Sequence, residues 1–397
     1  MSKFIAIPVG QGDAFYLELD GFSILIDGGR NRCAFSSMFR FATKTDGVNV
    51  IACTHNDADH VNGILGFLEA GLRCDELWLP GRWLSVLPDV LKPFIKVFDE
   101  LADNIAHTDS FSKTGELQSD LSPFEAYSEY GCDHMDNDPD PEEEPSVVVG
   151  GWPESCLEML EQAEPWEVFP HGLGLLDLKH RLFSPHSYYR RLDPANVEFL
   201  WSAIDAAARI RAIAIEAFHR GISVRWFEFD VVRPSGGIAV LQPMNAREIA
   251  KVRPSISSLL MRLSLSVSNK ESLVFWSPPS KNRQGVLFTA DSDLANVNLP
   301  HLDHAIVTAP HHGSEANRNA YKAVLAAASN GSSITWVRSD GKYRNRPGNT
   351  YLGLVSLRLC TLCRCLGGSS TAKQIVRLHS RNGVWRRHQG TRFCSCR

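Results

Sequence analysis

Three short apolar runs of this chain each end in aspartate or histidine, and no other feature limits the possible folds as strongly. NVIAC leads into THNDADH, GVLF leads into TAD, and AIVT leads into APHHGS. Loops at the ends of strands are where functional side chains are usually placed. We therefore expect a sheet whose strand ends bring these side chains together, namely His55, Asp57, Asp59, His60, Asp291, His311 and His312.

Imidazole nitrogen and carboxylate oxygen together suit divalent metal ions. A polar N-cap for the following helix would explain the first cluster alone, and a single Asp or His at a strand end is commonly structural. Three separate strand ends of this kind favour a metal site. The sequence predicts one or two divalent ions, with zinc as the first expectation and manganese or iron as alternatives.

The β-rich runs lie in two halves of the chain. Residues 3–9, FYLEL and SILID are expected strands separated by GQGD, DG and DGG turns, which predicts an antiparallel start. NVIACTH is expected to be a fourth strand, and VNGILGFLEAGL a helix. Strand-like runs resume with SVRWFEFDVV and continue to SITWVRS, and SSLLMRLSLSV is among them.

Between these halves, residues 84–232 are expected to form a helical insertion with an acidic flexible loop at about 133–145. We predict an α/β fold, a single domain over residues 1–397, in which two sheets pack face to face with helices outside in a four-layer αββα arrangement.

The charges of the chain are unevenly distributed. Seven carboxylates and no Lys or Arg lie between Asp133 and Glu144, whereas twelve Lys or Arg and no acid follow Asp340. The basic C-terminal segment 341–397, with Trp385 among arginines, is typical of nucleic-acid binding. A terminal strand pair with an exposed cationic face is the alternative.

Cellular location and cysteine use follow from the apolar and thiol patterns. No run reaches the 18 or more apolar residues of a membrane helix, so we expect a cytoplasmic protein without a membrane partner.

Five thiols lie close together near the end of the chain, but their spacing matches no standard zinc pattern, so we favour incidental cysteines over a structural zinc site. They are Cys360, Cys363, Cys365, Cys394 and Cys396.

THNDADH resembles the HxHxDH motif of the metallo-β-lactamase fold, with Asp57 where the second histidine usually stands. Together with VGQGDA, LIDGG, TAD and PHHGS, it resembles the metallo-β-lactamase domain of DNA-uptake (late competence) proteins. The matching blocks span residues 5–29, 51–69 and about 238–349. The insertion has no counterpart in this resemblance.

The resemblance implies two metal sites that share Asp291 as a bridge. One site would use Asp59 and His60 with either His311 or His312, and the other would use His55 and Asp57. Asp13 and Asp27 would orient imidazoles, although turn formation would also explain these two.

The chain departs from the family pattern at two places where a histidine is usual. They hold Gln242 and Asn349. The site of His55 and Asp57 is therefore the one whose occupancy the sequence leaves open.

Metal-assisted hydrolysis is the expected chemistry. Asp57 or Asp291 would accept a proton, and His312 would hydrogen-bond the departing oxyanion. The first hypothesis is a nuclease or phosphodiesterase, with nucleic acid and a protein of a defence or DNA-processing system as partners. The alternatives are a hydrolase of a small ester, lactone or nucleotide with the insertion as a lid, and a non-enzymatic subunit with a degenerate site.

Overall fold

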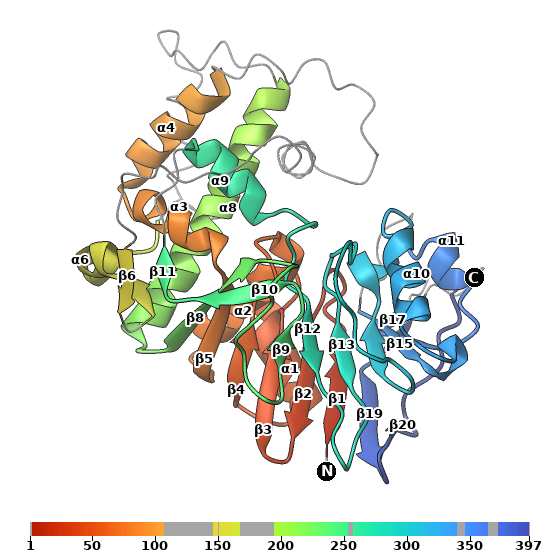
Figure 1. The fold of residues 1–397 in the computed structure, drawn as a ribbon. Helices are drawn as coiled ribbons and strands as arrows, with labels where there is room; N and C mark the ends of the chain where they lie inside the picture. The colour runs from red at the N-terminus through yellow and green to blue at the C-terminus, as the bar shows by residue number, and fades with distance from the viewer. Residues whose placement is uncertain are drawn as a thin grey trace. The chain divides into compact units, whose positions relative to one another are not determined.

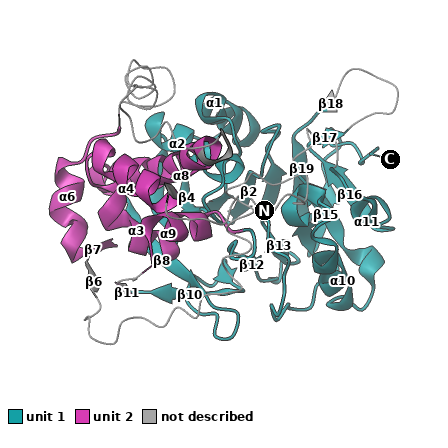
Figure 2. Ribbon diagram, turned by 90° about the horizontal axis from the view of Figure 1, so that it is seen from above, with its two compact units in different colours: residues 1–81, 222–250, 269–397 teal, residues 82–221, 251–268 magenta. Residues whose placement is uncertain are grey.

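The computed structural model describes residues 2–106, 146–149, 151–166, 194–252, 257–339, 346–363 and 372–396. The chain divides into two compact units, which Figure 2 colours separately. Unit 1 comprises Met1–Gly81, Ile222–Ala250 and Asn269–Arg397, and unit 2 comprises Arg82–Gly221 and Lys251–Ser268. The acidic loop expected at 133–145 lies outside the described residues. None of the described helices is both long and apolar enough to cross a membrane.

Unit 1 contains a large mixed sheet, and the α/β class is confirmed (Figure 1). The start of the chain is antiparallel as predicted, because β1 pairs with β2 and β2 with β3 in opposite directions. The next strands, β4, β5 and β8, continue the sheet in parallel. In spatial order, the described strands of this nine-stranded sheet are β10 (Ala246–Ile249), β8 (Ser223–Phe229), β5 (Arg73–Pro80), β4 (Gly47–Ala52), β3 (Phe22–Ile26), β2 (Phe15–Leu19), β1 (Lys3–Ala6), β19 (Val376–Arg381) and β20 (Val384–Arg387).

A second sheet of unit 1 carries the other half of the predicted site. Strands β13 to β16 run parallel to one another, so their carboxyl ends lie at one edge of the sheet. Its described strands, in spatial order, are β16 (Leu357–Cys360), β15 (Thr335–Arg338), β14 (Ile306–Thr308), β13 (Val286–Phe288), β12 (Phe275–Ser277) and β9 (Gln242–Pro243). A short pair, β17 (Leu362–Cys363) and β18 (Ala372–Lys373), follows β16.

Side chains of both sheets share one hydrophobic core. Phe4 and Phe15 of the first sheet stack near Phe288 of the second, with ring centroids 5.9 to 6.2 Å apart. The same core holds Trp78 and Phe275, which are fully buried. The alternation of apolar residues along these strands therefore buries one face of each sheet against the other.

Helices of unit 1 pack against the sheets on their other faces. Tyr16 of β2 packs on Phe39 of α1 (Arg32–Thr43), and Phe39 packs on Phe67 of α2 (Ala58–Glu69). Tyr321 of α10 (Arg318–Ala326) packs on Trp336 of β15. The remaining described helical turns of the unit are η4 (Pro310–Gly313), η5 (Gly331–Ser333) and α11 (Asn349–Leu352).

Unit 2 is mainly helical and buries its own apolar residues, such as Leu87, Leu101, Ile204 and Leu263. The insertion expected to be helical over residues 84–232 starts with two helices that are separated by residues 91–93. The described elements are α3 (Arg82–Val90), α4 (Phe94–Ala106), β6 (Ser146–Val149), β7 (Trp152–Pro153), η2 (Glu154–Cys156), α6 (Leu157–Gln162), α8 (Pro194–His219), β11 (Lys251–Val252) and α9 (Leu259–Ser266).

The strand expected for SSLLMRLSLSV is wrong, because residues 259–266 form helix α9. The side chain of Ser258 caps the helix by accepting a hydrogen bond from Met261 N at 3.3 Å. Leu259 and Leu263 are one helical turn apart and both buried. The leucine spacing satisfies a helical face as well as an alternating strand, and packing inside unit 2 selects the helix.

Candidate metal centre

All of the predicted site residues lie in unit 1, in loops or helical turns that follow strands of its two sheets. Asp13 lies between β1 and β2, and Asp27 directly follows β3. The THNDADH segment connects β4 to α2, TAD follows β13, and the two histidines follow β14 in η4. The structure therefore brings together segments that are separated by more than 230 residues of sequence.

Thr54 and Asp27 fix the two imidazoles of the first motif. Asp27 accepts hydrogen bonds from the Thr54 N–H at 2.9 Å and from Thr54 Oγ1 at 2.8 Å, and its Oδ2 lies 2.8 Å from His60 Nδ1. Since Thr54 Oγ1 donates to Asp27, His55 Nδ1, 3.0 Å away, donates to Thr54 Oγ1. Both Nδ1 atoms are thus occupied, and each ring presents Nε2 as its remaining ligand atom.

Helix α2 begins at Ala58, three residues before the predicted start, so Asp59 and His60 belong to its first turn. Asp57 occupies the N-cap position, but its side chain makes no capping hydrogen bond. Its Oδ2 lies 3.4 Å from His55 Nε2 instead. The geometry therefore gives little support to the reading of Asp57 as a simple helix cap.

Glycines let the backbone around this motif approach closely. A Cβ atom on Gly63 of α2 would lie 1.9 Å from Gly28 O, and a Cβ atom on Gly12 would lie 1.6 Å from Asp59 O. The Gly28 N–H donates to His60 O at 2.8 Å across the same contact. These close approaches hold the first turn of α2 against the loops that carry Asp13 and Asp27.

The second sheet contributes two turns that are joined to each other. Thr289 N donates to Thr308 Oγ1 at 2.9 Å, and Thr289 Oγ1 donates to Thr308 O at 3.0 Å. Beyond these threonines, His311 and His312 both adopt left-handed backbone conformations with φ of 46° and 54°. Such conformations are uncommon for residues other than glycine and cluster at functional sites.

The ligand atoms of both halves converge on Asp291. His60 Nε2 lies 3.3 Å and His312 Nε2 lies 3.4 Å from Asp291 Oδ1, and the two nitrogens are 3.3 Å apart. His312 Nδ1 lies 3.0 Å from Asp13 Oδ1, so His312 also presents its Nε2. Asp59 Oδ2 lies 3.6 Å from His312 Nε2. Four side chains of this centre can hold one metal ion, namely Asp13, His60, Asp291 and His312.

His311 and His312 differ in their surroundings. His311 Nδ1 lies 2.9 Å from Asn317 Oδ1, and its Nε2 lies 2.6 Å from Arg346 Nη2, which can only donate. His311 Nε2 therefore accepts this hydrogen bond, and it lies 3.5 Å from Asp291 Oδ2. Burial lowers the pKa of His311 to about 4, so the ring is neutral at pH 7.

A second group of ligand atoms lies beside the first. His55 Nε2 is 3.4 Å from Asp57 Oδ2 and 4.0 Å from Asp291 Oδ2. All three side chains are buried. Asp291 thus has one oxygen near His60 and His312 and the other near His55 and His311. The bridging role that the sequence resemblance implies for Asp291 stays a prediction.

The electrostatics of the first group show an excess of negative charge. Burial alone would lower the pKa values of His60 and His312, but Asp291 outweighs it, helped by Asp27 and Asp13 respectively, and both pKa values lie well above the ordinary value. Burial alone would raise the pKa of Asp291, but the surrounding histidines hold it well below its usual range. Protons on the imidazoles thus supply positive charge that a metal cation would otherwise provide.

The residues fit a divalent metal ion. Among the described side chains, Asp13 Oδ2, His55 Nε2 and Asp291 Oδ1 are buried atoms without a hydrogen-bond partner. Leaving such groups unsatisfied is costly, and three of them in one place need a common explanation. A cation at the first ligand group would satisfy Asp13 and Asp291, and a cation at the second would satisfy His55. This donor set suits zinc, manganese and iron.

Three residues that shape the centre were not predicted from the sequence. Thr54 lies inside the motif itself, and its hydroxyl group was the available signal. Asn317 donates to Asp291 O at 2.8 Å and contacts His311, and Arg346 contacts His311. Gln242 and Asn349, which stand where the family pattern usually has a histidine, are both exposed.

Trp385 is buried, and its indole N–H donates to Gln284 O at 3.0 Å. It therefore forms part of the core and offers no exposed surface for stacking on a base. Its strand β20 pairs with β19 at the edge of the nine-stranded sheet, which favours the alternative of a terminal strand pair.

A scan against protein-family models finds no match to this chain, and a search of curated proteins finds no significant match.

Proposed function

We propose that this chain is a metal-dependent hydrolase of the metallo-β-lactamase fold that acts on phosphodiester bonds of nucleic acids. The observation that carries the proposal is the convergence of His60 Nε2, His312 Nε2 and Asp291 Oδ1 within 3.4 Å of one another, at buried positions. The shared core of the two sheets and the helices on their other faces support a four-layer αββα arrangement.

The proposed ligands divide into two groups. His60, His312 and Asp291 would hold the first ion, and His55 and Asp57 would hold a second. Asp59 Oδ2 lies 3.6 Å from His312 Nε2, beside the first set of ligands. A divalent ion bound there supplies Lewis-acid polarisation and a water of lowered pKa, which is the chemistry of ester hydrolysis. His312 acts as a ligand in this proposal, because both of its ring nitrogens are already directed at Asp13 and at the centre.

One of these ligands, Asp57, and one neighbouring residue, Arg346, have further roles in the proposal. Asp57, whose carboxylate lies beside His55, is placed to accept a proton during the reaction. Arg346 is 7% exposed and donates to His311 at the centre, so a permanent positive charge lies beside the metal ligands. Guanidinium groups suit phosphate oxygens, and this charge favours a phosphodiester over a neutral ester.

The test combines metal loading with a panel of substrates. Protein reconstituted with Zn or Mn is incubated with single-stranded DNA, duplex DNA, RNA, a bis-aryl phosphate and an aryl acetate. We expect cleavage of a phosphodiester and its loss by at least 100-fold in Asp291→Asn and His60→Gln. His301→Gln is the matched control, because His301 is an exposed histidine with a side chain 64% accessible.

The outcomes separate the parts of the proposal. Failure of folded protein to bind a divalent ion at this centre would remove the proposal entirely. Metal binding with cleavage of the acetate alone would replace the substrate with a small ester. Metal binding without any hydrolysis would favour the non-enzymatic alternative.

A further inference from the structure

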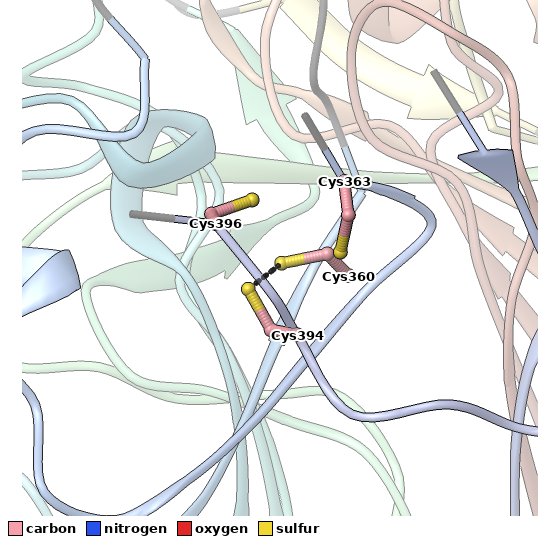
Figure 3. Close-up of side chains that lie close together, drawn as sticks. All are labelled: Cys360, Cys363, Cys394 and Cys396. Atoms are coloured by element: carbon pink, nitrogen blue, oxygen red, sulfur yellow. Dashed lines mark hydrogen bonds between the residues drawn. The ribbon is translucent and has the colours of Figure 1, made fainter. Parts of the chain in front are cut away.

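Two pairs of cysteines, more than 30 residues apart in sequence, gather in unit 1 (Figure 3). We call them the four-cysteine cluster: Cys360, Cys363, Cys394 and Cys396. Their Sγ atoms all lie within 4.8 Å of one another, and all four thiols are free. This gathering departs from the expectation of incidental cysteines. Cys365, the fifth thiol of that stretch, lies outside the described residues.

The cluster joins two segments of chain. Cys360 ends β16 and Cys363 ends β17, whereas the other two cysteines lie on the extended segment 391–396 after β20. The Cys394 N–H donates to Arg358 O at 2.9 Å, so this segment runs along β16, the edge strand of the six-stranded sheet. Gln374 also holds the segment, because its side chain donates to Cys360 O and Arg392 O at 2.8 and 3.0 Å.

The spacing of the sulfur atoms suits a tetrahedral ion. A zinc ion binds thiolates at about 2.3 Å, which places tetrahedral sulfurs about 3.8 Å apart. Within the cluster, the sulfurs of Cys360 and Cys394 are 2.9 Å apart, and small rotations of the side chains separate them to that spacing. Three of the four side chains are buried, and the fourth, Cys394, is partly buried. A closed, buried set of four cysteines is the form of a structural rather than a catalytic site.

The surroundings supply charge and hydrogen bonds for thiolates. Arg338 is fully buried beside the cluster, with Nη2 3.5 Å from Cys396 Sγ and 3.0 Å from Leu362 O. Its Nε and Nη1 have no hydrogen-bond partner among the described residues. Four thiolates with one Zn²⁺ carry a net charge of −2, which the guanidinium group partly balances. Tyr351 adds a hydroxyl group 3.3 Å from Cys360 Sγ.

We propose that the four-cysteine cluster binds a structural zinc ion that attaches the C-terminal segment 391–396 to the edge of the six-stranded sheet. Soft thiolate ligands in a tetrahedral set select zinc over magnesium, calcium or manganese. The attached segment covers an edge strand, and the ion closes a large loop of chain between residues 363 and 394. This proposal does not depend on the hydrolase proposed above.

The experiment must distinguish this ion from any metal at the histidine–aspartate centre. The background is therefore the double variant His60→Gln, Asp291→Asn, which lacks two of the proposed ligands of that centre. We expect it to purify with one equivalent of zinc by elemental analysis. Its cobalt-substituted form should show intense thiolate-to-metal charge-transfer bands and the visible absorption of tetrahedral cobalt.

Two further substitutions made one at a time in this background, Cys363→Ser and Cys396→Ser, should reduce bound zinc at least tenfold and abolish the charge-transfer bands. Cys33→Ser is the matched control, because Cys33 is an exposed cysteine outside the cluster, and it should retain the full equivalent. If the cluster variants do not fold, X-ray absorption at the zinc edge of the background variant, in which all four cysteines are intact, gives the ligand set directly. It should show four sulfur ligands at about 2.3 Å.

Three results would overturn the proposal. The first is a background variant that purifies without zinc and whose four cluster thiols react freely with an alkylating reagent. The second is a Cys360–Cys394 disulfide in mass spectra of the non-reduced protein. The third is iron as the co-purified metal. A zinc ligand shell of nitrogen and oxygen alone would also exclude the cluster as the binding site.

Discussion

At the scale of single residues, the centre depends on side chains that hold the Nδ1 atom of each ligand histidine. Asp27 and Asp13 do this for His60 and His312, and Thr54 does it for His55. With Nδ1 occupied, Nε2 is left to face the other ligands. Thr54 is the least obvious member of this set, because its one hydroxyl group contacts both Asp27 and His55.

Thr54→Val keeps the shape of this side chain and removes the hydroxyl group. We expect metal affinity at the centre to fall by about 10- to 100-fold, the usual effect of losing a group that orients a ligand. Thr54→Ser restores the hydroxyl group and should recover most of the affinity. Titration with Zn or Mn against a competing chelator measures both variants. Equal affinities for Val and Ser would show that the hydroxyl group does not orient His55.

The sequence was informative about ligand types and less so about their supporting contacts. Asp and His at the ends of apolar runs predicted the positions of the converging side chains because strand ends share a sheet edge. Asn317 and Arg346 carry no comparable local signal. Arg346 contacts His311 because folding brings together two segments 35 residues apart in sequence. Asn317 lies only six residues after His311, but it also donates to Asp291 O across 26 residues, a contact that the local sequence does not reveal.

At the scale of elements, glycine contacts between helix α2 and the loop after β3 help to position the centre. Gly28 and Gly63 donate hydrogen bonds to His60 O and Gly29 O, both at 2.8 Å. The run VNGILGFLEAGL predicts a helix that begins at Val61, three residues after the observed start at Ala58. The tertiary contact at Gly28, which the local sequence does not reveal, holds Asp59 and His60 inside the first turn.

Gly63→Ala tests this contact. Alanine favours a helix over glycine by about 1 kcal/mol, but the added Cβ would lie 1.9 Å from Gly28 O, so the helix must move. We expect a net loss of about 1–3 kcal/mol in the free energy of unfolding and weaker metal binding. Gly390→Ala is the control, because a Cβ there meets nothing closer than 3.6 Å. Urea denaturation measures both, and unchanged or increased stability of Gly63→Ala would contradict the prediction.

Helix α9 and the four-cysteine cluster both depend on which segments meet in the folded chain. The leucines of α9 fit either period, and the cysteines lie on segments more than 30 residues apart that only the sheet edge brings together. Periodicity and ligand spacing describe local chain, so neither could indicate these contacts.

At the scale of the whole molecule, the centre couples metal binding to protons because both sheets of unit 1 direct carboxylates at it. In the metal-free protein these carboxylates hold the pKa values of His60 and His312 well above the ordinary value. The stability that these protonated rings contribute is full below the unfolded pKa of about 6.5. It is lost as pH rises through the raised pKa of the folded protein.

Metal binding at neutral pH must displace these protons, because a metal ion needs the Nε2 lone pairs. We expect the release of up to two protons per metal ion, and an affinity that falls up to about tenfold per pH unit for each proton as pH decreases. Calorimetric titrations at pH 7 in buffers of different ionisation enthalpy count the protons. His312→Gln should release fewer than the wild type, and the exposed control His301→Gln should release as many. Binding at pH 7 without proton release would mean that the imidazoles are already neutral, and the charge balance inferred for the centre would be wrong.

The midpoint temperature of thermal unfolding gives a second measurement of the same coupling between metal binding and pH. The difference between metal-loaded and chelator-treated protein should widen as pH rises, since binding strengthens while the metal-free protein loses the contribution of its protonated histidines.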